Sequence, residues 1–340
     1  MRSRFPLLAA LATSACITHL GDEAPSFGRV TGDCVVSVRG AREVTSPVAA
    51  ELGGRVVWVF ERVVLDDGTA VHGARAALPD AGSACGGVDL ERDPAGRVVA
   101  LLEPDADDRA ADAARKDGRE TRTAPLAAVG AEGGGALYYE VSLVDPSGAR
   151  PAEPVGVGVC ALAGPRCDRA GRPRFDRRLR PSSALRSDDG SVLVLSCTSA
   201  SAFEQTCTLA RATAASALDP AAYEVRGIDG WSRDPAAAVA VAHDPGATSL
   251  RLAPGDAGPA LVVVDPFEAR VSARVARAWG EPFGDRRPLF GLAPPPPGSL
   301  VGGGLAQPGT GSRVVVAYTT SNPERAGLHL ATFELDRGLR

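Results

Sequence analysis

The chain has 340 residues, with 37 Lys and Arg against 41 Asp and Glu, so its formal net charge at pH 7 is −4. Hydrophobic residues make up 44% of the chain and charged residues 23%, a balance that excludes a globally disordered protein. The slightly acidic charge argues against nucleic-acid binding, which favours a basic surface. The length allows one large domain or two medium-sized domains.

The first residues have the pattern of an export signal. Two arginines precede the apolar run Phe5–Ala12, which is too short to span a bilayer. The segment Thr13-Ser14-Ala15-Cys16 follows and resembles a bacterial lipoprotein box, in which Cys16 receives a diacylglycerol and becomes the new N-terminus. We therefore predict a signal peptide over residues 1–15 and a lipidated Cys16 with a polar tether over residues 16–30.

The predicted location follows from the same motif. Ile17 rather than Asp follows Cys16, which favours the outer membrane or cell surface of a Gram-negative bacterium. The membrane partner is then the lipid anchor on Cys16. The alternatives are ordinary secretion or a periplasmic location after cleavage behind Ala15, and a buried N-terminal helix.

Six cysteines remain once Cys16 is set aside, an even number that suits disulfides in an oxidising compartment. Their spacing predicts three pairs: Cys34–Cys85, Cys160–Cys167 and Cys197–Cys207. The chain has no C-x-x-C or H-x-x-x-H spacing for zinc, and no motif calls for a cofactor. Buried free thiols are the alternative.

After the tether the sequence predicts one strand after another, separated by turn residues such as Asp66-Asp67-Gly68. The predicted strands are 35–39, 55–65, 98–102, 137–144, 155–162, 191–197, 206–212, 260–264, 271–276, 313–319 and 328–335. The segment 105–123 lacks an apolar stripe, which favours an exposed loop or frayed helix. Strands at this spacing predict an all-β fold.

Several strand pairs end alike, as in C-T-L-A-R-A at 207–212 and V-S-A-R-V-A-R-A at 271–278. Such a repeat is typical of radial repetition of small sheets. Strand 328–335 could close the ring by sharing a sheet with residues 34–39. We expect a single five-bladed β-propeller domain over residues 31–340, with a β-sandwich or two small β domains as the alternatives.

The motifs 183–197, 207–212, 218–238, 271–284 and 313–323, in this order, resemble a bacterial family of secreted domains of unknown function. Members of that family look like five-bladed β-propeller glycosidases, and the resemblance extends over most of residues 52–335. It implies acidic residues around a central axis, because glycoside hydrolysis uses two carboxylates.

This chain departs from the family pattern at two presumed axial positions. Where the family has F-G-D-T, the chain has Phe60-Glu61-Arg62-Val63, and where the family often has A-H-P-E, it has Ala306-Gln307-Pro308-Gly309. Both departures put hydrolysis in doubt. The remaining candidates for a funnel are three carboxylates, Glu61, Glu140 and Asp265, and three ligand-binding side chains, Tyr138, Arg186 and Gln307.

We therefore expect a cell-envelope lipoprotein whose glycosidase-like propeller binds a glycan or a protein partner without catalysis. The first alternative is an active glycoside hydrolase or lyase on a surface polysaccharide. The second is a structural surface protein. The arginine-rich segment 164–181 is either an anion-binding patch or a solvated connection, and we favour the connection.

Overall fold

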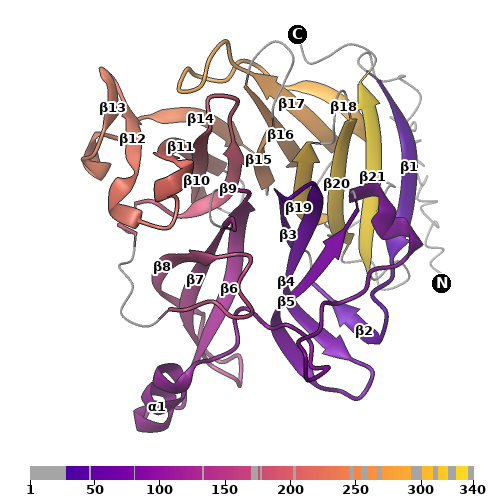
Figure 1. The fold of residues 1–340 in the computed structure, drawn as a ribbon. Coiled ribbons are helices and arrows are strands. Elements are labelled where there is room, and N and C mark those ends of the chain that lie inside the picture. The colour runs from indigo at the N-terminus through magenta and orange to yellow at the C-terminus, as the bar shows by residue number, and fades with distance from the viewer. Residues whose placement is uncertain are drawn as a thin grey trace, which may run out of the picture.

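The computed structural model describes residues 28–335, apart from 46, 80, 132–133, 170–174, 177, 202–203, 246–248, 254–258, 266–269, 292–300, 309–312 and 321–326. The fold is all-β, as the strand pattern predicts, and its strands form five antiparallel sheets (Figure 1). The predicted signal peptide and the lipidated Cys16 lie outside the described residues, and the tether over 16–30 lies outside them up to residue 27.

Four sheets follow one another along the chain. The first contains β2 (Ala41–Val44), β3 (Pro47–Leu52), β4 (Arg55–Leu65) and β5 (Ala70–Leu78). The second contains β6 (Glu120–Val129), β7 (Ala136–Val144) and β8 (Glu153–Ala161). The third contains β9 (Pro181–Arg186), β10 (Ser191–Ser201), β11 (Glu204–Thr213), β12 (Glu224–Gly227), β13 (Gly230–Ser232) and β14 (Ala240–Pro245). The fourth contains β15 (Ser249–Ala253), β16 (Ala260–Asp265), β17 (Arg270–Val275) and β18 (Arg287–Gly291).

The fifth sheet joins the two ends of the described chain. Its strands are β19 (Val301–Pro308), β20 (Arg313–Thr320), β21 (Leu328–Leu335) and β1 (Gly28–Val36). β1 runs antiparallel to β21, with Cys34 opposite Leu330. The sheet shared between the first and last strands, expected from the sequence, is therefore present, although β1 begins before the expected start at residue 34.

The sheets pack against one another in cyclic order. Each middle strand sends alternate side chains to opposite faces, as the pleat requires. Trp58 and Phe60 of β4 face the fifth sheet, whereas Val57 and Val59 face the second. The same alternation builds a core between the second and third sheets, between the third and fourth, and between the fourth and fifth. Five buried clusters thus link five sheets in a ring.

One edge strand of each sheet lies toward the centre of this ring. β3, β6, β9, β15 and β19 each contact the next, and β19 returns to β3. These five are called the inner strands below. They converge near the middle of the view in Figure 1. Their ends therefore bring residues from distant parts of the sequence to a common axis.

Three disulfides form with the pairing that the spacing predicts, namely Cys34–Cys85, Cys160–Cys167 and Cys197–Cys207. The first ties β1 to the short 3₁₀ helix η1 (Ala81–Gly86), which follows the first sheet. The third joins β10 and β11 at positions directly opposite each other. The disulfides favour an oxidising, exported environment.

One prediction about local structure held in part and another was wrong. The segment 105–123 contains the exposed helix α1 (Ala106–Ala114) and an irregular connection, but from residue 120 it forms the start of β6, which was not expected. α1 buries no residue, so apolar packing does not stabilise it. A capping box does, in which the Asp105 and Asp108 carboxylates each accept a hydrogen bond from the backbone N–H of the other residue. Residues 98–102 make only isolated bridges, such as Ala74 with Ala100, instead of a strand.

The remaining helices are single 3₁₀ turns beside the third sheet: η2 (Ala214–Ser216), η3 (Pro220–Ala222) and η4 (Pro235–Ala237). Within the described residues, no helix is both long enough and apolar enough to cross a membrane.

Candidate functional site

A cavity of about 450 Å³ opens where three inner strands end. Its walls are residues 49–54 from β3 and its turn, residues 128–131 from the end of β6, and residues 184–187 from the end of β9. We call it the axial cavity, because the inner strands that form it surround the common axis. Most of its lining side chains are small, so backbone groups contribute much of the wall.

Glu51 and Arg186 are the two charged residues that line the axial cavity. Both are exposed, and within the described part of the chain neither side chain makes an ion pair or hydrogen bond. They come from different walls, Glu51 from β3 and Arg186 from β9. The cavity therefore offers one acceptor carboxylate and one donor guanidinium to a ligand. Among the predicted site residues whose side chains the structure describes, Arg186 alone lines it.

The wall between β3 and β6 depends on a glycine. A Cβ atom placed on Gly130 would lie 2.0 Å from the backbone oxygen of Glu51, so only glycine allows the two strand ends to approach this closely. Beyond Leu52, Gly53 and Gly54 take positive φ values of 60° and 73° and turn the chain directly into β4. Such a two-residue turn holds the base of Glu51 on a fixed strand end.

Glu61 and Glu140 lie away from the end of their sheets that forms the axial cavity. Glu61 follows Phe60, which is opposite the first residue of β3, and Glu140 is opposite Ala124 of β6. With about 3.3 Å per strand residue, Glu61 is roughly 16 Å and Glu140 roughly 13 Å from the cavity end of its sheet. Both belong to second strands, β4 and β7, so neither lines the cavity.

Each of these two carboxylates is held by an arginine of the next sheet. Arg122 of β6 donates to Glu61. Arg180, directly before β9, donates to both oxygens of Glu140, at 2.7 and 2.9 Å. The hydrogen bond to Glu140 raises the pKa of the Arg180 guanidinium, which therefore stays charged. Both oxygens of Glu140 are occupied by this fork-like contact.

Asp265 is also paired. It ends β16, is 8% exposed, and accepts a hydrogen bond of 3.1 Å from Arg286. The three carboxylates suggested for a funnel therefore come from second strands and each contacts a guanidinium. Glu61 and Glu140 thus join neighbouring sheets through ion pairs, and Asp265 joins two parts of one sheet.

Aromatic side chains make up the cores between sheets. Tyr138 is fully buried, and its hydroxyl lies 2.6 Å from that of Tyr223, so its ring presents no face to a sugar. Burial raises the pKa of Tyr138, which stays protonated. Trp58 and Tyr318 are buried as well. Gln307 lies in inner strand β19, paired in register with Val315.

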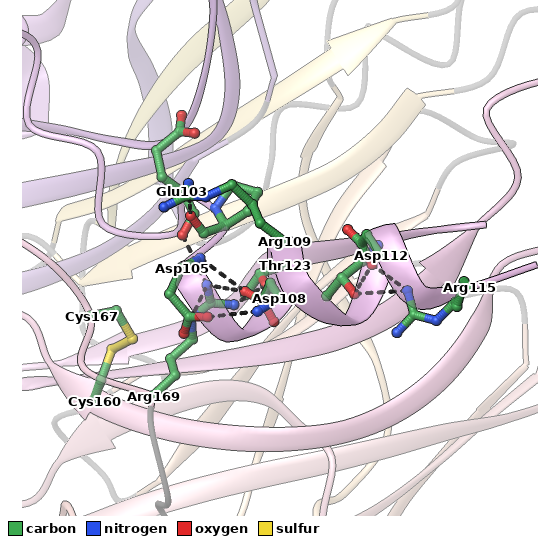
Figure 2. Close-up of polar contacts among 12 residues, drawn as sticks. Glu103, Asp105, Asp108, Arg109, Asp112, Arg115, Thr123, Cys160, Cys167 and Arg169 are labelled. Atoms are coloured by element: carbon green, nitrogen blue, oxygen red, sulfur yellow. Dashed lines mark hydrogen bonds and ion pairs between the residues drawn. A yellow bond between two sulfur atoms is a disulfide. The ribbon is translucent and has the colours of Figure 1, made fainter. Parts of the chain in front are cut away.

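A second polar cluster fastens α1 to the second sheet (Figure 2). The side chain of Arg169 is only 6% exposed and lies beside the Cys160–Cys167 disulfide. It donates to Thr123 of β6, to the backbone oxygen of Glu103 at 2.9 Å, and to Asp108 at 2.5 Å. Its buried Nε has no partner within the described chain.

Two arginines of the segment 164–181 have partners within the described chain. At two described positions, 169 and 180, arginines bind carboxylates of the chain itself, so these two are structural rather than free for an anion. Three other arginines, Arg172, Arg174 and Arg177, lie outside the described residues. The segment 164–181 is therefore bound to the rest of the chain at Arg169 and Arg180. No local pattern in the sequence indicates these two contacts.

No group of three or more His, Cys, Asp or Glu residues with the geometry of a metal site occurs in the described part of the chain. Cys160 and the other five described cysteines are all in disulfides. The charged groups that the described residues contribute to the axial cavity are one carboxylate and one guanidinium.

No protein-family model and no curated protein matches the chain. Among solved structures, a protein from Bacteroides ovatus proposed to be a hydrolase aligns with 12% identity and a TM-score of 0.55, over 87% of this chain and 86% of its own. The GH43_1 enzyme from Xanthomonas citri, complexed with xylotriose, aligns with 12% identity and a TM-score of 0.49, over 88% and 89%. The α-L-arabinofuranosidase from Podospora anserina aligns with 10% identity and a TM-score of 0.45, over 92% and 98%. The likeness to the B. ovatus protein shows a shared fold.

Proposed function

We propose that the chain is an exported five-bladed β-propeller that binds a saccharide in its axial cavity and does not hydrolyse it. The observation that carries this proposal is the cavity itself, in which a carboxylate and a guanidinium are both without partners among the described residues. The propeller assignment, with one domain over residues 31–340, is supported by the cyclic packing of five sheets and by the ring of inner strands.

Binding of a saccharide is supported by the chemistry of the lining. Carboxylate and guanidinium groups supply the acceptors and donors that a polyhydroxylated ligand uses. A volume of about 450 Å³ lies within the usual range for small-molecule sites. The resemblance of the sequence to glycosidase-like secreted domains supports the same ligand class.

The proposal that the chain does not hydrolyse its ligand rests on the number and position of the carboxylates near the cavity. Glycoside hydrolysis uses a pair of carboxyl groups about 5–10 Å apart, one to protonate the leaving oxygen and one to attack or activate water. Glu51 is the only acidic residue that lines the described axial cavity. The other candidates, such as Glu140, are bound to arginines and lie on second strands, away from the cavity.

The test uses the mature chain, residues 16–340, with Cys16→Ser so that it is free of lipid. A glycan array identifies ligands, and the release of reducing ends from each ligand measures hydrolysis. We expect binding without release, with Arg186→Gln and Glu51→Gln each weakening binding at least about tenfold. The matched controls are Arg277→Gln and Glu281→Gln, on an exposed loop of the fourth sheet, which should leave binding unchanged.

The outcomes separate the alternatives. Release of reducing ends that Glu140→Gln abolishes would establish the active hydrolase instead. Binding that neither cavity variant weakens would place the ligand elsewhere. A chain that binds no glycan and co-purifies with an envelope protein would support the protein-binding or structural alternatives.

We further propose that a lipid on Cys16 anchors the domain to the outer membrane or cell surface. The three disulfides support export, and the lipoprotein motif supports the anchor. Radiolabelled palmitate should label the wild-type chain, and Cys16→Ser should move the protein from the membrane fraction to the soluble one. Equal fractionation of both would contradict the anchor.

A further inference from the structure

We propose that the saccharide unit in the axial cavity is zwitterionic, with an anionic group toward Arg186 and a cationic group toward Glu51. This inference rests on the proposed function, because it names the class of sugar for the same cavity. It follows from the two unpaired charges, from the nature of the other lining residues, and from the way both charges are held.

The two charges make the cavity locally neutral but polar. Glu51 contributes one negative charge from β3 and Arg186 one positive charge from β9. They form no ion pair with each other or with another described residue, in contrast to Glu61 and Glu140, whose carboxylates both pair. A ligand that covers both groups removes them from water, which is costly unless each finds a partner.

The other lining residues cannot replace those partners. None of the described residues that line the axial cavity is aromatic, so these residues offer a sugar no stacking. The hydroxyl of Ser187 is already engaged with Asp189 and with the backbone oxygen of Ser191, at 3.0 Å for the latter. Affinity must therefore come from hydrogen bonds to the charged pair and the backbone. Such bonds are roughly twice as strong as neutral ones when the donor or the acceptor is charged, and an opposite charge on the ligand adds Coulomb attraction.

The opposite signs select between classes of sugar. A uronic acid places its carboxylate well against Arg186 but gives Glu51 no counter-charge, and in a polyanion the neighbouring carboxylates repel it. An amino sugar satisfies Glu51 and leaves Arg186 without an anion. A unit that carries both groups pairs with both walls at once, with a guanidinium–carboxylate contact on one side and an ammonium–carboxylate contact on the other.

Both charged residues extend from fixed backbone positions, which lowers the cost of binding. Glu51 is opposite Val56 beside the tight Gly53–Gly54 turn. Arg186 is opposite Val192, and the following turn is closed by the bond from the backbone N–H of Ser187 to Ser191, 2.9 Å long. The backbone positions that carry the two charges are therefore fixed, so only the two side chains have to become ordered when a ligand binds.

The test compares four monosaccharides by titration calorimetry on the mature Cys16→Ser chain: muramic acid, which carries a carboxylate and an amine, glucuronic acid, glucosamine and glucose. We expect muramic acid to bind at least about tenfold tighter than the other three at low salt, and to weaken as salt rises. Arg186→Gln should remove its advantage over glucosamine, and Glu51→Gln its advantage over glucuronic acid. Arg277→Gln and Glu281→Gln should leave the ranking unchanged.

The failures are distinguishable. If a glycan binds in the cavity but glucose competes as well as muramic acid, or if the cavity variants leave the ranking intact, the zwitterionic assignment is overturned while the proposed function stands. If no monosaccharide and no arrayed glycan binds, both fall. If glucuronic acid ranks first and Glu51→Gln tightens it further, the site takes an anionic sugar and the inference is wrong.

Discussion

Replacement of Arg169 by methionine should loosen α1 and lower the stability of the second sheet. Arg169 joins three parts of the chain: β6 through Thr123, the helix N-terminus through Asp108, and the segment before it through the backbone of Glu103. Methionine keeps an apolar stem of similar reach and removes the guanidinium. The variant therefore reports on the polar contacts and less on packing.

The magnitude follows from the burial of each partner. A hydrogen bond to a charged group contributes about 1.5–3 kcal/mol and a neutral one about 1 kcal/mol. Asp108 and Asp105 are 19% and 25% exposed, so they remain partly hydrated when the arginine is gone. Removal of the buried Nε of Arg169, which has no hydrogen-bond partner among the described residues, stabilises the variant by about 1 kcal/mol. A decrease of about 3 kcal/mol in the free energy of unfolding is expected, a large part of a typical total of about 5–15 kcal/mol.

Urea denaturation of the oxidised protein measures this change, and hydrogen exchange across 104–123 locates it. Arg109→Met is the matched control, because Arg109 lies on α1 but is exposed and donates only to the backbone of Pro104. Its urea midpoint should match that of the wild type. The reasoning is refuted if both variants unfold at the same midpoint, or if Arg169→Met leaves exchange of α1 unchanged.

Three further predictions concern the cavity wall, the disulfides and acid titration. Gly130→Ala should lower the free energy of unfolding in urea by about 1–3 kcal/mol and abolish ligand binding, because the new Cβ meets the backbone of Glu51. Gly86→Ala is the control, because a Cβ at residue 86 enters open space. Equal urea midpoints for the two variants would contradict the contact. Replacing both cysteines of a disulfide by alanine should destabilise the protein in the order of loop length, which is Cys34–Cys85, then Cys197–Cys207, then Cys160–Cys167. The expected loss is roughly 4 kcal/mol for the longest loop and roughly 2–3 kcal/mol for each of the other two. A reversed order in calorimetry would argue against the pairing. The pKa of Asp145 is lowered from 3.8 to about 2, first by the Ser147 hydroxyl and then by Arg150. Its contribution to stability is therefore present above pH 4 and lost as the pH falls toward 2. Ser147→Ala should raise this pKa toward 3.8 in a carboxyl NMR titration, and an unchanged value would exclude the hydrogen bond.

The sequence predicts the middle strands well and the inner strands poorly. β4, β16 and β21 occupy residues that the apolar, β-branched pattern marks out, because both faces of each middle strand are buried between sheets. The inner strands carry short, small-residue sequences such as Pro47–Leu52 and Val301–Pro308, which have no apolar alternation. None of the five was predicted as a strand.

This difference explains why the site was found only in part. Candidate carboxylates such as Glu61 and Glu140 come from middle strands that the sequence pattern predicts, whereas Glu51 lies in an inner strand that it does not predict, and so Glu51 was missed. Arg186 was predicted and lines the axial cavity. The turn Gly53-Gly54 is the sequence signal that could have located Glu51, since a tight turn before a middle strand marks the end of an inner one.

Long-range partners are the other part that the sequence does not contain. Arg169 meets Asp108 across 61 residues, and Arg180 meets Glu140 across 40. Charge pairs at such separations have no local periodicity, so an arginine-rich segment looks the same whether it is solvated or structural. The disulfides were predictable because an even count and two short loops leave one simple pairing.

A crystal structure of the mature chain with the tightest saccharide from the array tests the central claim most directly. The account predicts an intact glycosidic bond and a sugar in the axial cavity, with polar atoms within hydrogen-bond distance of Glu51 and Arg186. A sugar bound beside Glu140, outside the axial cavity, or a cleaved product in either place, would contradict it.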